Sequence, residues 1–235
     1  MLMGQMLGKP ERLKVYWKQF VFEVDKIGVQ SLGIVALLSI FMGGVITLQT
    51  ASNIDSALIP AYTIGFATRQ SVILEFSPTL ISLILAGKVG SNIASEIGTM
   101  RITEQIDALD IMGVNSASYL IFRKVVASVF IFPPLIIISM FLGIAAGGFF
   151  GDAAGLITWS EFTYGIQFEF KSFSVIYALV KTVLFALIIT TISSYFGYFT
   201  KGGALQVGES STKAVVYSSI YILLANYILT QLLLL

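Results

Sequence analysis

The chain has 235 residues, of which 56% are hydrophobic and 11% are charged, and its mean hydropathy is +0.88. Soluble domains carry about a quarter charged residues, so this composition excludes a water-soluble globule. The formal net charge of +1 gives no general attraction for nucleic acid or for an acidic protein. The sequence has no cysteine and no histidine, which excludes disulfides, thiolate nucleophiles and catalysis by imidazole.

The order of the apolar segments predicts an all-α polytopic membrane protein. Segments of about 20 apolar residues are long enough to cross a bilayer as helices. Five such spans are expected, at residues 28–51, 71–89, 119–150, 173–199 and 214–235. The third span is long enough to tilt in the membrane or to bend after Pro133 and Pro134.

An amphipathic segment precedes the first span. Its apolar residues recur at helical spacing and its charged residues lie mostly off that stripe; the apolar positions are Leu13, Trp17, Phe20, Val24 and Ile27. The pattern predicts an interfacial helix over residues 10–27 that lies in the headgroup plane. The alternative is a soluble cytoplasmic helix packed on a partner. The sequence shows no internal repeat or linker, so we expect one domain over residues 1–235, with a transmembrane region over 28–235.

Positive charge is concentrated in one set of loops. Eleven of the 14 lysine and arginine residues fall in the N-terminal segment, in the loop between spans two and three, and in the loop between spans four and five. Because positively charged loops stay in the cytoplasm, we expect the N-terminus and residues 91–118 inside and the C-terminus outside. Residues 53–70 and 152–171 are then expected to face the periplasm.

Three ionisable residues lie at or inside the apolar spans, namely Glu75, Lys88 and Lys181. Charge inside a bilayer is costly, so such residues usually face a bundle interior or a wet cavity. Glu75 and Lys181 are expected at similar depth in the outer part of the membrane. They are candidates for a structural ion pair or for a polar contact with a substrate. Lys88 is near the inner end of its span, where a lysine can snorkel to the surface.

Two other patterns have simple interpretations. Gly143, Gly147, Gly151 and Gly155 recur every four residues, which predicts close helix packing on one face. The string nearest to a phosphate-binding loop, Gly87-Lys88-Val89, lacks the hydroxyl residue after the lysine and the glycine five positions before it. Any ATP must therefore be hydrolysed by another chain. The sequence predicts no catalytic residue, no metal site and no cofactor.

The loop after the second span contains a short amphipathic helix. Thr103 is expected to cap its N-terminus, with Glu104 and Asp107 near the positive end of the helix dipole and Gly113 at its end. Ile102, Ile106 and Leu109 form its apolar face. Such a helix either lies on the membrane or binds a cytoplasmic partner, and the residues alone do not decide between these uses.

Several motifs run in order from Glu75 to Val114. They are EFSP at Glu75–Pro78, AGKVGS at Ala86–Ser91, SEIGTM at Ser95–Met100, TEQIDAL at Thr103–Leu109 and MGV at Met112–Val114. In order and spacing they resemble the signature of the MlaE-type permeases, the membrane subunits of lipid-transporting ABC systems. Later stretches are also similar to that family: Gly202–Ala204, Val207–Gly208, SSTKAVV at Ser210–Val216, and Lys181 followed by Phe185.

The chain departs from the family pattern at a few positions. Lys88 stands where the family usually has arginine, Ser77 where it has glycine, Ala186 where it has glycine, and Asn226 where aspartate is common. Lysine keeps the positive charge of arginine but loses its fork-shaped, bidentate geometry. A bidentate phosphate contact at position 88 is therefore in doubt.

The resemblance implies a homodimeric permease in the bacterial inner (cytoplasmic) membrane that moves phospholipids between the inner and outer membranes. The implied partners are a cytoplasmic ABC ATPase subunit, a periplasmic MCE-domain lipid-binding protein and, in some systems, a small STAS-domain subunit. The loop helix would be the coupling helix, and the residues implied in coupling to the ATPase are Glu96, Thr103, Glu104, Ile106, Asp107 and Leu109. Glu75, Lys88 and Lys181 are the candidates for the lipid path.

Two other function classes compete with this interpretation. A stand-alone secondary transporter or channel would work without an ATPase, and internal repeats or more intramembrane charge would be typical of it. A membrane-embedded enzyme would have to use Glu75 and Lys181, because no histidine or cysteine is present. Co-purification with an ATPase would separate the three classes.

Overall fold

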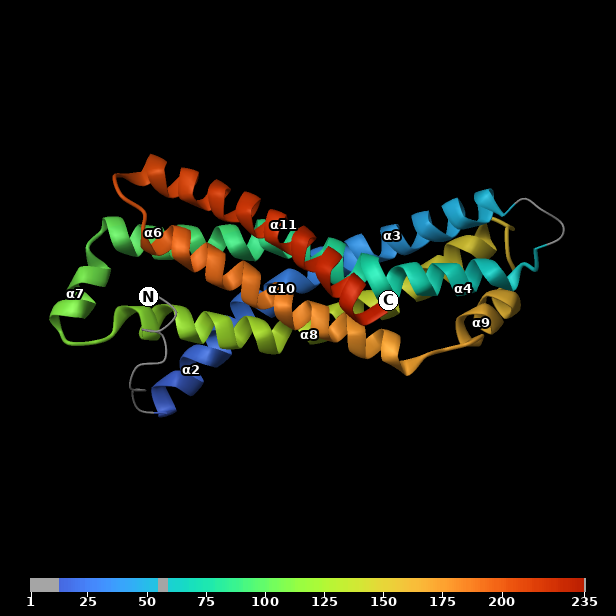
Figure 1. Cartoon of the computed structure of the whole chain (residues 1–235), viewed down its shortest axis with the longest axis horizontal. Coiled ribbons are helices and arrows are strands. Elements are labelled where there is room, and N and C mark those ends of the chain that lie inside the picture. Colours follow the sequence, from blue (N-terminus) through green and yellow to red (C-terminus); the bar gives the residue numbers. More distant parts are fainter. Residues whose placement is uncertain (1–12, 55–58, 235) are drawn as a thin grey trace. The chain divides into compact units, whose positions relative to one another are not determined.

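The structure is a computed structural model that describes residues 13–54 and 59–234. Over these residues the secondary structure is helical, without β-strands (Figure 1). Within residues 13–54 and 59–234, 5 helices are long and apolar enough to cross a membrane: Gln19–Asn53, Tyr62–Ile102, Ser118–Ala153, Ser172–Tyr198 and Ala204–Leu233. The predicted all-α fold with five spans is therefore confirmed.

The spans are built from α-helices and short π-helical segments. The α-helices are α2 (Leu13–Val24), α3 (Gln30–Asn53), α4 (Tyr62–Ser71), α5 (Ile81–Leu85), α6 (Ser91–Ile102), α7 (Gln105–Ile111), α8 (Arg123–Ala153), α9 (Trp159–Gln167), α10 (Ser172–Tyr198) and α11 (Ala204–Leu234). The π-helical segments are η1 (Asp25–Val29), η2 (Val72–Leu80), η3 (Ala86–Gly90) and η4 (Ser118–Phe122). A π-helical turn widens the helix locally and is frequent at functional sites.

The helices extend beyond the predicted spans. The second begins at Tyr62 instead of residue 71, and α11 begins at Ala204 instead of residue 214. The helices are longer than the predicted spans because hydropathy marks only where the apolar residues stop, while the backbone hydrogen bonds of a helix continue through polar residues. The predicted interfacial helix over 10–27 corresponds to α2 and η1, which continue into α3 without a break, and its residues 10–12 lie outside the described residues. Residues 55–58 of the predicted loop 53–70 also lie outside them.

The chain groups into two compact units by its internal contacts. Of the described residues, unit 1 contains 13–31, 82–132 and 183–234, and unit 2 contains 32–54, 59–81 and 133–182. In unit 1, α11 packs along α6 and η3. Ser211 supports this packing, because its hydroxyl donates to the backbone carbonyl of Ser91 at 3.0 Å. The expectation of one domain over residues 1–235 stays a prediction.

Unit 2 has a small apolar core beside the packed helices α4 and α9. The core residues are Ala51, Ile64, Ile157 and Phe162. Helix α9 lies in the predicted loop 152–171, and its N-terminus is fixed by a capping box between Thr158 and Glu161. Hydrogen bonds from Thr158 also lower the pKa of the Glu161 carboxyl. The Thr-x-x-Glu pattern is a sequence signal that could have predicted this helix.

The glycine stripe of α8 does provide close packing, as predicted, at its first three positions. An added β-carbon at Gly143 would lie 3.3 Å from Val72 Cγ1, and one at Gly151 would lie 2.9 Å from Ile157 Cγ2. An added β-carbon at Gly147 would overlap the Thr47 side chain. Gly155 instead sits in a turn with a φ of 68°, a left-handed conformation that suits glycine.

Gly43 of α3 lies so close to the backbone of Gly143 in α8 that it yields a prediction. A β-carbon there would overlap the backbone carbonyl of Gly143, which cannot swing aside as a flexible side chain would. We expect Gly43→Ala to destabilise the protein by about 1–3 kcal/mol, measured as a lower melting temperature of the purified chain in detergent. Gly33→Ala in the same helix is the control, because a β-carbon there meets nothing within 4 Å. Equal melting temperatures for the two variants would contradict this packing.

Candidate functional site

Glu75 and Lys181 form an ion pair in unit 2. Their side chains come from η2 and α10, and Lys181 Nζ lies 2.8 Å from Glu75 Oε1. The Lys181 side chain is 0% exposed and the Glu75 side chain is 42% exposed. The ammonium also lies 4.4 Å from the centre of the Tyr177 ring, a favourable cation–π distance. The sequence expectation that these two charges lie at similar depth is consistent with this contact, while their role on a lipid path stays a prediction.

The segment around the EFSP motif supplies the partners of Lys181. It lies in the π-helical segment η2, in which Pro78 has no N–H to donate. Lys181 Nζ donates to the Leu74 carbonyl at 3.2 Å. Thr79 donates to the second carboxylate oxygen of Glu75 at 3.2 Å. The motif therefore supplies an anion and a carbonyl acceptor to one buried lysine.

Hydroxyl groups tie the helices together next to the motif. Ser139 of α8 donates to Ser77 at 3.1 Å, and Ser39 of α3 donates to Ser139 at 2.8 Å. All three serines are buried, and interhelical hydroxyl contacts of this kind stabilise packing in apolar surroundings. Ser77, a departure from the glycine usual in the family, thus has a packing partner in this chain.

A second and larger ionic cluster lies in unit 1. Lys124 at the start of α8 contacts Glu23 of α2 at 2.8 Å and Glu96 of α6 at 2.9 Å. Lys26 of η1 contacts the other oxygen of Glu96 at 2.6 Å, and Arg123 lies 3.4 Å from Glu23. We call Glu23, Lys26, Glu96, Arg123 and Lys124 the inner network. In the sequence its cations fall among the loop charges, and the network is not predictable from them, since sequence spacing does not show which distant helices meet.

Lys88 borders the inner network. Its ammonium donates to the backbone carbonyl of Gln30, and it helps to line a small pocket with Lys26, Asn92, Glu96 and Lys124. The structure therefore brings Lys88 toward the inner network of unit 1. Its predicted place on a lipid path stays a prediction.

The helix in the loop after span two is present as α7, but its start differs from the prediction. Thr103 does not cap α7: it is the C-cap of α6, and its hydroxyl donates to the Thr99 carbonyl at 2.8 Å. The chain turns at Glu104, whose φ is 59°, and α7 begins at Gln105. The predicted end is correct, because Gly113 takes a left-handed φ of 76° directly after Met112.

The apolar residues of α7 divide between the interior and the surface. Ile106 is 0% exposed, so it packs inside the chain and is not a surface contact in this conformation. Leu109 is partly buried, and Glu104 and Asp107 are exposed. The exposed apolar side chains of this segment are instead Ile111 at 87% and Met112 at 68%. The sequence could not distinguish these positions, because a seven-residue helix has no clear periodicity.

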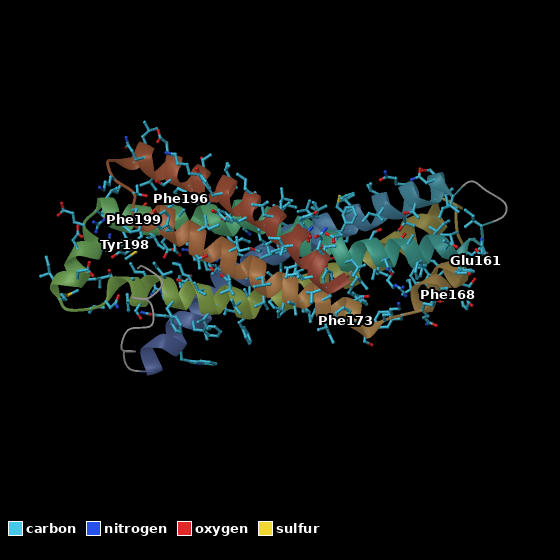
Figure 2. All side chains as sticks on the ribbon, in the orientation of Figure 1. Glu161, Phe168, Phe173, Phe196, Tyr198 and Phe199 are labelled. Carbon is cyan, nitrogen blue, oxygen red and sulfur yellow. The ribbon has the colours of Figure 1, made fainter. Side chains whose placement is uncertain are left out.

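Contacts at the base of α7 fix its direction. Arg101 pairs with Asp107 at 2.5 Å, and its guanidinium lies 5.9 Å from the centre of the Tyr198 ring. The Tyr198 hydroxyl is hydrogen-bonded to Ser116 at 3.0 Å, beyond the other end of α7. Figure 2 shows Tyr198 with Phe196 and Phe199 at the C-terminal end of α10. Tyr198 thus contacts both ends of the segment that carries α7.

Arg69 falls within residues 53–70, which were expected to form a periplasmic loop, and the structure buries it in unit 2 with 4% exposed. Its guanidinium donates to the carbonyls of Ile166 and Phe168 at 2.7 and 2.9 Å, at the C-terminal end of α9. The carbonyls at a helix C-terminus lack intrahelical donors, and a cation is favourable there. Arg69 therefore fixes the end of α9, where Figure 2 labels Phe168.

Comparison with known protein families identifies the family of this chain. The family model described as Permease MlaE matches residues 20–232. The chain belongs to the MlaE permease family. The motifs from Glu75 to Val114, which predicted this membership, lie within the matched residues.

Relatives of this MlaE-family chain support the same assignment. A probable ABC transporter permease protein of Rickettsia bellii is 38% identical over 227 residues, which cover 94% of this chain and 85% of the relative. One from Synechocystis is 35% identical over 89% of this chain and 80% of the relative. The chloroplastic protein TRIGALACTOSYLDIACYLGLYCEROL 1 of Arabidopsis thaliana is 31% identical over 97% of this chain and 65% of the relative.

Family membership and the helices establish the general role of the molecule. It is a multi-pass membrane protein and a permease subunit of the ABC transporter type. Transporters of that type take their energy from an ATPase, which implies an ATPase partner for this MlaE-family subunit. Among the described residues, no group of three or more metal-binding side chains is present.

Proposed function

We propose that this permease moves phospholipids between the inner and outer membranes of a bacterium, as a homodimer driven by a separate cytoplasmic ATPase. The observation that carries the proposal is the Glu75–Lys181 pair, because it combines a fully buried ammonium with a partly exposed carboxylate inside apolar helices. A phospholipid needs an apolar path for its tails and charged groups at one depth for its headgroup. The pair supplies such charged groups beside apolar helix surfaces.

The name of one relative is consistent with a lipid substrate. The name of the Arabidopsis relative contains that of a galactolipid. A galactolipid and a phospholipid share two acyl tails and a polar headgroup, so one kind of apolar path with a polar end suits both. Phospholipid is the substrate proposed for the present chain, because an ammonium favours an anionic phosphate. The Lys181 ammonium is enclosed in this conformation, so the proposed contact requires the site to open during transport.

A second copy of the chain is proposed to cover α11. Of its most apolar stretch, 11% is buried inside the chain, compared with 39% to 56% for the other membrane helices. Its large exposed apolar side chains include Leu205, Tyr217, Leu224, Tyr227 and Leu232. Aromatic residues are enriched in protein interfaces, which favours a subunit contact over lipid along this helix.

The proposed ATPase contact is the segment around α7. Ile111 and Met112 are its most exposed apolar side chains, and Glu104 and Asp107 are exposed beside them. We place this segment in the cytoplasm on the basis of the charge bias of the loops. The opposite face would deliver lipid to, or receive it from, a periplasmic MCE-domain protein, and a STAS-domain subunit is a further proposed partner. The competing proposal, a stand-alone secondary transporter or channel, has no use for such a docking segment.

The headgroup role of Lys181 can be tested by substitution. We expect Lys181→Ala to reduce the phospholipid recovered with the purified complex and the rate of transfer between vesicles. The exchanged pair, Glu75→Lys with Lys181→Glu, separates the two roles of the site. Each charge keeps a partner in that variant, so it should restore folding but not transfer if Lys181 binds the headgroup.

Two outcomes would contradict the headgroup role. One is full transfer by Lys181→Ala at normal expression. The other is recovery of both stability and transfer by the exchanged pair, which would show a structural ion pair. Lys213→Ala serves as the control for removing a lysine, because Lys213 is 60% exposed in a surface pair with Glu209.

The segment around α7, which is the proposed ATPase contact, yields a separate prediction. Ile111→Asp places a charge where an apolar contact is proposed, so it should prevent co-purification of the ATPase while the permease remains inserted and folded. Ile106→Asp is the comparison variant, because it buries an unpaired charge and should lower folding itself. An undiminished complex with Ile111→Asp would place the ATPase contact elsewhere.

A further inference from the structure

The inner network joins segments that are far apart in the sequence. It connects α2 and η1, which precede the first span, to α6 and to the start of α8. We propose that Glu23, Glu96 and Lys124 are positioning residues, which fix α6 so that movement of the α7 segment is transmitted to α2 and α8 during transport. This inference rests on the proposed function, since it assumes that an ATPase moves α7.

The geometry makes Lys124 the centre of the network. Its ammonium lies 2.8 and 3.1 Å from the two carboxylate oxygens of Glu23, and 2.9 Å from Oε1 of Glu96. Lys26 takes the other oxygen of Glu96 at 2.6 Å. Each carboxylate oxygen of Glu96 therefore accepts from a different lysine. The Lys124 and Glu23 side chains are 1% and 2% exposed, so water screens their contact little.

Glu96 is well placed to transmit movement from α7. It lies in α6, six residues before the helix ends at Ile102, which is about 9 Å at the rise of an α-helix. Between α6 and α7 lie Thr103 and Glu104, and the salt bridge from Arg101 to α7 spans that turn. A displacement of α7 would thus reach Glu96 through a short and stiff connection.

The rest of α6 is held by close packing of small residues and aliphatic side chains. Ala94 and Ile97 lie against Gly197 of α10, and Gly98 lies against Val207 of α11. These contacts are apolar and have no directional partner; the hydrogen bond from Ser211 to the Ser91 carbonyl joins α6 to α11 at its first residue. The ionic contacts of Glu96 are directional, so they set the position of α6 relative to η1 and α8.

The choice of charged residues supports a positioning role over simple stabilisation. Replacing a buried ion pair by apolar residues of similar volume is often neutral or stabilising, because burial removes the hydration of both charges. The outer side of α2 is apolar, with Trp17 69% and Phe22 63% exposed, while its inner side carries Glu23. Moving Glu23 would therefore move an apolar helix surface that suits the membrane interface.

The test measures ATP hydrolysis and lipid transfer together in proteoliposomes that contain the complete complex. The double variant Glu23→Met with Lys124→Met replaces the buried pair by apolar side chains, a change that is often neutral for stability, and it also removes the Glu23 contact of Arg123. We expect it to bind the ATPase and to hydrolyse ATP, but to transfer about 5-fold less lipid per ATP, the lower range of a typical coupling energy. The matched control, Glu209→Met with Lys213→Met, removes an exposed pair and should keep the wild-type ratio.

A second variant keeps the test decisive if the double variant does not assemble. Glu96→Gln removes one charge without changing the size of the side chain, and the Glu96 side chain is 28% exposed. The same loss of lipid transferred per ATP is expected. A wild-type ratio in either assembled variant would overturn the inference. Failure of the unaltered chain to bind an ATPase or to transfer lipid would instead overturn the proposed function.

Discussion

Charge placed inside apolar helices is the constraint on which this structure depends. A charged side chain in a low-dielectric environment is expensive unless it is paired and hydrogen-bonded. The chain meets this requirement at two places, with Lys181 between Glu75 and the Leu74 carbonyl, and with Lys124 between Glu23 and Glu96. Each buried lysine has at least two oxygen acceptors from helices other than its own.

The two ionic sites are built differently, and this matches different proposed roles. Glu75 leaves 42% of its side chain exposed while Lys181 is fully buried, so a molecule from outside the chain would meet the carboxylate first. Glu23 and Lys124 are both enclosed, so their contact can act only within the protein. Substrate contact is proposed for the first site and the positioning of helices for the second.

Hydropathy was sufficient to predict the number of spans and the helical class, because a membrane span is a property of a continuous segment. Glu75 and Lys181 were also recognisable in the sequence as candidates for an ion pair, because a charge inside an apolar span needs a partner. The inner network was not predictable, since Glu23 and Lys124 are 101 residues apart and their pairing depends on helix packing. The exposure of Ile111 and the burial of Ile106 depended on tertiary contacts in the same way.

The proposed function requires the α7 segment to face the cytoplasm and α9 to face the periplasm, so that energy enters at one side and lipid is exchanged at the other. Labelling of single cysteines in intact spheroplasts with a membrane-impermeant maleimide tests it most directly, because the native chain has no cysteine. Ala108 and Ser160 are exposed positions in α7 and α9. The account predicts that Ser160→Cys is labelled at once and Ala108→Cys after permeabilisation. Labelling of Ala108→Cys in intact spheroplasts would contradict it.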